Sequence, residues 1–259
     1  MSTTSQWIDI AGPDGTFQAY LAVPHVGKGP AIILLQEIFG VNEHIRAVAD
    51  QYAADGYVVL VPDLFWRAGA HIELGYDADG WKRAVELMQA TDNPHADADI
   101  AATVAVLRAR PEVTGKLAAV GYCFGGRLSY QAAAAGLVDV AIAYYGGGIQ
   151  NKLDLADQIK VPLLMHFGGQ DSHIPPEAVQ KIAERFEDRQ DVEIHIYPGA
   201  EHGFNCTHRD SYQQRAAAQA HGHSLIFLAE NLYDCLARLA GRQCRIQYAP
   251  SSNAAWALK

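Results

Sequence analysis

The chain has few cysteines, and no pattern commits them to a structural role. Only four occur in 259 residues, at Cys123, Cys206, Cys235 and Cys244. No two of them form a CxxC pair or follow zinc-finger spacing, so the sequence indicates neither a disulfide framework nor a structural metal site. We therefore expect reduced thiols, and we expect the protein to need no metal.

Positive charge and long apolar runs are also scarce. Lys and Arg number 20 against 29 Asp and Glu, which gives a formal net charge of -9. An acidic surface repels nucleic acid and anionic lipid, so neither is an expected partner. No run approaches the roughly 18 apolar residues of a membrane-spanning helix, and the first 15 residues lack a basic-then-apolar signal pattern. We predict a cytoplasmic protein.

No Ser-, Gly- or Pro-rich linker, repeat or low-complexity segment divides the chain. Its length and its 49% hydrophobic content are enough for one large core. We predict a single domain over residues 1–245 and a C-terminal tail over 246–259, in a monomer or homodimer.

The sequence does contain a regular alternation of short apolar runs and longer helical patterns. Residues 6–10 and 17–24 alternate around the turn-prone AGPDG, which predicts an antiparallel hairpin at a sheet edge. Later apolar runs are nearly continuous, as expected for strands covered by helices on both faces. These runs lie at 31–38, 57–63, 116–122, 140–148, 161–169 and 192–200, and helices are expected near 43–54, 80–90, 96–110, 125–136, 176–189 and 210–240. The pattern predicts an α/β fold with a mostly parallel, doubly wound sheet of about eight strands.

Polar residues lie at the ends of several of these predicted strands. Ligands of open α/β sheets bind outside the carboxyl ends of the strands, so these residues are candidates for a site. They are Glu37, Asp63, Cys123, Asp171 and His202. The stretch 64–95, rich in Gly, Asp, His and Trp, is expected to lie over the same edge.

Cys123 lies in GYCFGG, between a predicted strand and a predicted helix. This is the context of a nucleophile elbow, with cysteine where many hydrolases carry serine. The N-terminus of the following helix favours a thiolate, and the backbone N–H of Phe124 is free to stabilise an oxyanion. The alternative is a buried, inert cysteine beside a tight turn.

A cysteine nucleophile needs a proton acceptor, and that imidazole needs an acid to orient it. Asp171 follows one later strand and His202 follows the next. Alone, Asp171 could be a turn residue or a helix cap, and His202 is one of 11 histidines. The order nucleophile, acid, histidine is that of α/β-hydrolases, and it favours a catalytic triad.

Six stretches together resemble the dienelactone hydrolase family of the α/β-hydrolase superfamily, over residues 5–240. They are LLQEIFGVN (34–42), VPDLF (61–65), GYCFGG (121–126), YYGGG (144–148), GGQDSHIP (168–175) and HGF (202–204). The resemblance implies the α/β-hydrolase fold and cofactor-independent hydrolysis of an ester or lactone through a thioester on Cys123.

The resemblance also implies two further roles. Glu37 would lie near the resting cysteine and assist its deprotonation, because a carboxylate in a dry pocket has a raised affinity for protons. The backbone N–H of Ile38 would join that of Phe124 in the oxyanion hole. Without the resemblance, Glu37 could equally be a loop residue bonded to nearby backbone.

The substrate pocket departs from the family pattern. Family members resemble one another in holding an anionic substrate with two arginines, and those positions correspond here to Trp81 and Cys206. Neither residue can replace a guanidinium, although Lys82, Arg83 or Arg209 could compensate. We predict a pocket for a neutral or aromatic ester, unless Trp81 and Cys206 only pack. Its expected lining is Phe39, Trp66, Trp81, Tyr145 and Cys206.

Two other classes of protein remain open from the residues. One is a different cysteine-based enzyme, amidase-like or redox, and the other is a binding protein that retains the fold without catalysis. Asp171 and His202 argue against both.

Overall fold

The computed structural model describes residues 3–91 and 93–233. The predicted boundary at 245 and the tail 246–259 lie outside these residues. Within them, the chain forms one eight-stranded sheet in the order β1-β2-β4-β3-β5-β6-β7-β8. The strands are β1 (Thr4–Gly12), β2 (Gly15–Val23), β3 (Gly29–Leu35), β4 (Val58–Pro62), β5 (Val113–Tyr122), β6 (Val140–Tyr144), β7 (Leu163–Gly168) and β8 (Val192–Tyr197). The predicted fold class and strand number are confirmed.

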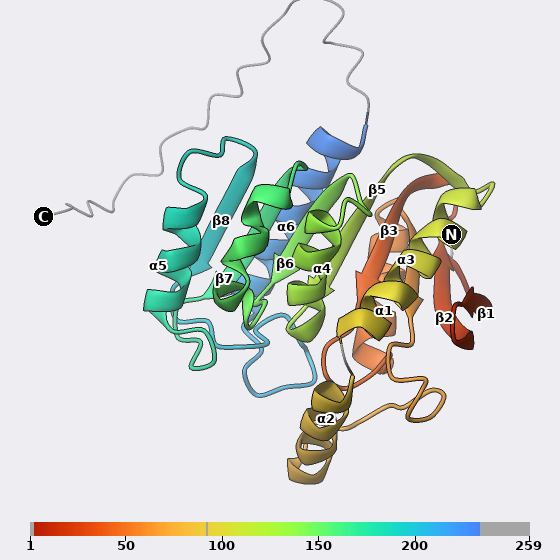
Figure 1. Cartoon of the computed structure of the whole chain (residues 1–259), viewed down its shortest axis with the longest axis horizontal. Coiled ribbons are helices and arrows are strands. Elements are labelled where there is room, and N and C mark those ends of the chain that lie inside the picture. Colours follow the sequence, from red (N-terminus) through yellow and green to blue (C-terminus); the bar gives the residue numbers. More distant parts are fainter. Residues whose placement is uncertain (1–2, 92, 234–259) are drawn as a thin grey trace, which may run out of the picture.

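Helices cover both faces of this sheet. In Figure 1, α3 and α4 cross in front of the strands and α6 passes behind them. The helices are α1 (Glu43–Ala54), α2 (Ala78–Ala90), α3 (Asn93–Ala109), α4 (Phe124–Ala134), α5 (Pro176–Arg185) and α6 (Gln214–Leu232), with short 3-10 turns η1 (Ile149–Asn151) and η2 (Leu153–Gln158). No described helix is both long enough and apolar enough to cross a membrane.

The strand patterns explain the mixed sheet. β1 pairs with β2, and β2 with β4, in antiparallel registers, so the predicted edge hairpin is present. The remaining neighbours pair in parallel. Every residue of β3, β4, β6 and β7 is buried, as expected for strands covered on both faces, whereas the edge strand β8 is only partly buried.

The last described helix begins later than the sequence predicts. The expected start was residue 210, but α6 begins at Gln214. The preceding segment turns repeatedly instead, because the N–H of Cys206 donates to Gly203, that of Arg209 to Cys206, and that of Tyr212 to Arg209. These turns bring the segment over the carboxyl edge of the sheet.

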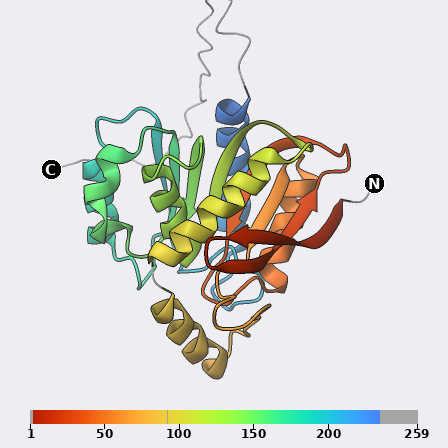
Figure 2. The ribbon, with the colours of Figure 1, turned by 45° about the vertical axis from the view of Figure 1, so that its right-hand side comes forward.

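The insertion 64–95 lies over the same edge, as expected. Asp63 shapes its first part, because its two carboxylate oxygens accept the N–H groups of Phe65 (3.0 Å) and His71 (2.9 Å). The second part is α2, which projects beyond the sheet in both views (Figures 1 and 2). The insertion and the turns before α6 therefore flank the strand ends that carry the candidate site.

Candidate active site

Cys123 joins β5 to α4 in a backbone conformation that few side chains adopt. Its φ is 54° and its ψ is -111°, and its N–H donates to the carbonyl of Tyr144 at 3.0 Å. Glycines make this turn possible: a Cβ on Gly121 would lie 1.9 Å from the carbonyl oxygen of Gly125, and one on Gly125 would lie 2.1 Å from that of Leu35. The strained turn places the thiol at the carboxyl edge of the sheet.

The structure brings Cys123, His202 and Asp171 together. His202 Nε2 lies 3.1 Å from the Cys123 sulfur, and His202 Nδ1 lies 2.8 Å from Asp171 Oδ2. The other oxygen of Asp171 accepts the N–H groups of His173 (2.8 Å) and Ile174 (3.1 Å). This leaves the carboxylate fixed, so it orients the imidazole toward the sulfur.

The electrostatics of His202 favour its protonated form. Burial alone would lower the pKa of His202, but Cys123 and Asp171 outweigh burial through charge and hydrogen bonds and raise the pKa to about 10. A protonated imidazole beside sulfur stabilises a thiolate, which is the nucleophilic form of cysteine. The arrangement can therefore hold an activated sulfur nucleophile.

Glu37 lies at the end of β3 in an unusual environment for a carboxylate. Its residue surface is 1% exposed, and neither carboxylate oxygen has a hydrogen-bond partner in the described part of the chain. Arg209 Nη1 lies 3.7 Å away. Burial raises the pKa of Glu37 more than the charges of Arg209 and His202 lower it. This carboxylate is therefore a ready proton acceptor within the site.

Two backbone amides are available at the same edge. The N–H of Gly125 donates to the carbonyl of Gln36 at 2.9 Å, which ties the start of α4 to the loop after β3. The neighbouring amides of Phe124 and Ile38 donate to no backbone carbonyl among the described residues. Free amides beside a nucleophile are the donors that an oxyanion requires.

An open cleft of about 580 Å³ adjoins the site and contains one prominent cation. The guanidinium carbon of Arg209 lies 5.7 Å from the ring centre of Phe39, 6.0 Å from that of Tyr76 and 5.8 Å from that of Trp81. The three aromatic faces and the Glu37 carboxylate thus surround Arg209. The cleft combines apolar stacking surfaces with a partly paired positive charge.

The structure brings most of the predicted pocket residues to this region. Phe39 and Trp81 line the cleft, and the ring of Tyr145 lies 5.1 Å from that of His202. The backbone φ of Tyr145 is 36°, and its buried hydroxyl has no hydrogen-bond partner in the described residues. Cys206 is fully buried, and it is a free thiol, as is Cys123. Burial, aided by the charge of Glu37, raises the pKa of Cys206 to about 11, so it is a weak nucleophile.

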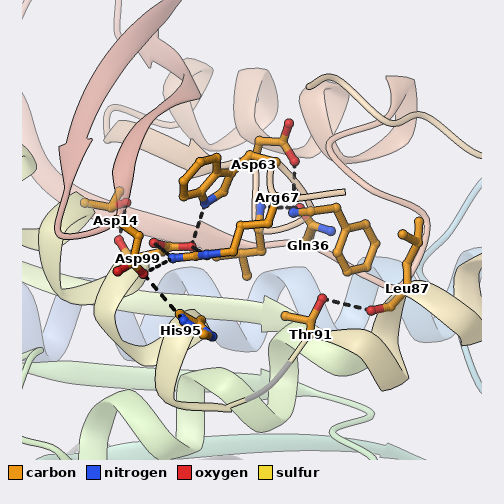
Figure 3. Close-up of polar contacts among 12 residues, drawn as sticks. Asp14, Gln36, Asp63, Arg67, Leu87, Thr91, His95 and Asp99 are labelled. Atoms are coloured by element: carbon orange, nitrogen blue, oxygen red, sulfur yellow. Dashed lines mark hydrogen bonds and ion pairs between the residues drawn. The ribbon is translucent and has the colours of Figure 1, made fainter. Parts of the chain in front are cut away.

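Trp66 is the exception. Its indole N–H donates to Asp99 at 2.8 Å, and its ring stacks on Phe17 with centres 5.8 Å apart. Trp66 therefore packs the edge hairpin against α3 and does not line the cleft. Figure 3 shows the ion pair of Asp99 with Arg67 in this region.

Sequence reasoning missed Tyr76, which lines the cleft, and His173, which lies beside the triad, and it left Arg209 undecided. Tyr76 lies in the insertion, where no periodic pattern indicates side-chain direction. The ring of His173 lies 4.9 Å from that of His202 and 6.0 Å from that of Trp81, and its only signal was its place two residues after Asp171. Arg209 was one of three possible cations.

Comparisons with known proteins identify the family of this chain. The family model described as "Dienelactone hydrolase family" matches residues 17–232. The chain belongs to the dienelactone hydrolase family. The carboxymethylenebutenolidases of Pseudomonas putida and Pseudomonas knackmussii are each 37% identical over 227 residues, which cover 87% of this chain and 96% of theirs.

The structural comparison extends the family assignment to the fold. A Klebsiella pneumoniae protein described provisionally as a dienelactone hydrolase superposes with a TM-score of 0.79 at 28% identity, over 89% of this chain and all of its own. The sheet and its helices are therefore an α/β-hydrolase fold, and this member of the family is a hydrolase of esters or lactones.

Proposed function

We propose that this hydrolase works through a Cys123–His202–Asp171 triad and a thioester intermediate, without a cofactor. The observation that carries the proposal is the continuous contact from sulfur to imidazole (3.1 Å) and from imidazole to carboxylate (2.8 Å). The Cys123 sulfur attacks the carbonyl carbon, and the amides of Phe124 and Ile38 stabilise the oxyanion. The tetrahedral intermediate collapses to a thioester, and the departing alkoxide takes a proton from His202.

Hydrolysis of the thioester completes the cycle. Neutral His202 accepts a proton from water, and the resulting hydroxide attacks the thioester carbonyl. Collapse of the second tetrahedral intermediate releases the acid and returns the Cys123 sulfur to its resting state. When the resting sulfur is neutral, Glu37 accepts the thiol proton and returns it to the sulfur as the acid is released. Its raised pKa and unpaired oxygens support this role.

The preferred substrate is a neutral aromatic ester. Aromatic rings line the cleft, and Arg209 already faces the Glu37 carboxylate at 3.7 Å. A substrate carboxylate would have to compete with Glu37 for that guanidinium.

A second candidate is a carboxylated lactone. The names of the curated relatives favour it, as does the presence of a cation in the cleft. A comparison of kcat/KM for matched neutral and carboxylated substrates decides between the two. A preference for the carboxylated lactone would mean that Arg209 binds the carboxylate of the substrate.

The triad is tested by Cys123→Ala with a panel of aryl esters, lactones and thioesters. We expect turnover to fall by about 10⁴-fold or more, because the reaction loses its nucleophile. Cys235→Ser is the matched thiol control and should keep wild-type rates. In His202→Gln, mass spectrometry should detect the acyl group on Cys123. Wild-type turnover by Cys123→Ala would overturn the mechanism, and cleavage of amides alone would favour an amidase-like enzyme.

We further propose that the protein is cytoplasmic and that it is a monomer or a homodimer.

A further inference from the structure

A second cluster of nitrogen and sulfur donors lies beside the cleft. It consists of His44, in the first turn of α1, with Cys206 and His208, in the turns before α6. One donor atom from each residue lies within 4.8 Å of the other two. The proposed reaction uses none of the three as a reacting group, so the cluster needs its own explanation.

Local structure holds these residues together. The side-chain oxygen of Asn42 caps α1 by accepting the N–H of Ile45, and its amide nitrogen donates to the hydroxyl of Tyr76. On the other side, the amide of Cys206 donates to Gly203. The two histidine rings lie edge to face, with centres 5.9 Å apart.

The three donors differ in burial, and one of them is buried without a partner in the described residues. His44 is 3% exposed, and its Nε2 has no hydrogen-bond partner in the described part of the chain. A buried ring nitrogen without a hydrogen-bond partner destabilises the folded state. Binding of an ion or a water molecule to this nitrogen would remove that cost. Cys206 is fully buried and its thiol is free, whereas His208 keeps 41% of its side chain exposed.

We propose that His44, Cys206 and His208 form a binding site for a divalent metal ion of the zinc class. Two imidazoles and one thiolate are a donor set that suits a borderline-soft ion. As the sulfur–metal bond forms, the thiol proton of Cys206 leaves for the solvent. The donors must draw together by about 1 Å to reach tetrahedral bond lengths, and exposed His208 is free to make that movement.

The surroundings provide a fourth ligand and a route of entry. Glu43 Oε2 lies 3.9 Å from His208 Nε2, and its side chain is 82% exposed, so it can close the coordination or leave the position to water. A second cleft, of about 390 Å³, opens beside His44 and Thr207 between α1 and α6. An ion can therefore approach the buried donors without passing the triad.

The test uses the full chain, stripped with a chelator and titrated with Co²⁺. We expect one Co²⁺ per chain and a near-ultraviolet thiolate-to-cobalt charge-transfer band, with Zn²⁺ displacing the Co²⁺. Cys206→Ser should remove the band, and His44→Gln or His208→Gln should weaken binding by at least about tenfold. Because His208 is exposed, His208→Gln keeps the test valid if a core variant fails to fold.

The controls separate this cluster from the other thiols and histidines of the chain. Cys123→Ser, the double variant Cys235→Ser/Cys244→Ser and the exposed His25→Gln should each keep the band and the affinity. Loss of the band in Cys123→Ser would overturn the proposal and place the ion on the triad. Absence of a band in the wild type, or its persistence in Cys206→Ser, would also overturn it.

Discussion

Asp99 and Glu37 are both buried carboxylates, but their surroundings are opposite. Asp99 is fully buried and accepts two N–H groups of Arg67 (2.6 and 3.2 Å) and the indole N–H of Trp66 (2.8 Å). Glu37 is 1% exposed, yet it accepts no hydrogen bond among the described residues, and its nearest cation stands 3.7 Å away. One carboxylate is therefore satisfied and the other is not.

The difference separates a structural carboxylate, Asp99, from a carboxylate with a proposed role in the reaction, Glu37. The bonds from Arg67 and Trp66 to Asp99 fix the start of the insertion against α3. Burial removes the Glu37 carboxylate from water and raises its pKa, and the nearby Arg209 only partly offsets this, so its charged form is disfavoured. An unsatisfied carboxylate in an active site is typical of a group that accepts a proton during reaction.

The largest expected effect is on catalysis at Glu37. Glu37→Gln keeps the shape of the side chain but removes its basic oxygens, so we expect kcat/KM for an ester to fall by about 10²–10⁴-fold. Chemical denaturation below the ordinary carboxyl pKa, where Glu37 is protonated in the folded and unfolded states, should give a free energy of unfolding within about 1 kcal/mol of wild type. An unchanged kcat/KM would show that the thiol needs no help from this carboxylate.

The converse variant changes the satisfied carboxylate. Asp99→Ala leaves Arg67 and Trp66 without their shared partner, so the free energy of unfolding should fall by about 3–5 kcal/mol. The lower end applies, because Arg67 is 30% exposed and retains its 2.7 Å bond to Asp14. Asp14→Ala, at an exposed pair, is the control and should cost less than about 1 kcal/mol. Equal losses of unfolding free energy in Asp99→Ala and Asp14→Ala would show that the buried ion pair is worth no more than the exposed one.

A smaller effect is expected from Trp66. Trp66→Phe removes one donor from Asp99 but leaves the two bonds from Arg67, so unfolding should become easier by about 1–2 kcal/mol. Since Trp66 lies outside the cleft, kcat/KM for aryl esters should remain at the wild-type value. A selective loss of activity on aryl esters would return Trp66 to the substrate pocket.

The smallest effect concerns pH. Burial raises the pKa of Glu37 above its ordinary 4.5, so between the two pKa values the folded chain binds a proton that the unfolded chain has lost. Stability should therefore fall as pH rises through this window, by about 1.4 kcal/mol per unit of pKa difference. The stability difference between wild type and Glu37→Gln, measured across that pH range, isolates the contribution. A difference that grows in the opposite direction would mean that the folded pKa is lowered.

Periodicity was sufficient to predict the sheet. Its central strands are covered on both faces and read as continuous apolar runs, and its edge hairpin shows an alternating pattern. The order of Cys123, Asp171 and His202 along the chain also predicted the candidate triad, since parallel strands end at one edge of the sheet. The cleft was harder to predict. The directions of Trp66, Tyr76 and Arg209 depend on partners distant in sequence, and no local pattern encodes such contacts.

The hydrogen bond from Gly125 to Gln36 has a consequence for how this enzyme can diverge. The two proposed oxyanion donors, Phe124 and Ile38, lie one and two residues from its ends, so this main-chain bond helps to fix their spacing. Side chains of the insertion and of the turns before α6 can be exchanged without moving those amides. Substitutions around the cleft can therefore change which substrates bind while the oxyanion donors keep their positions.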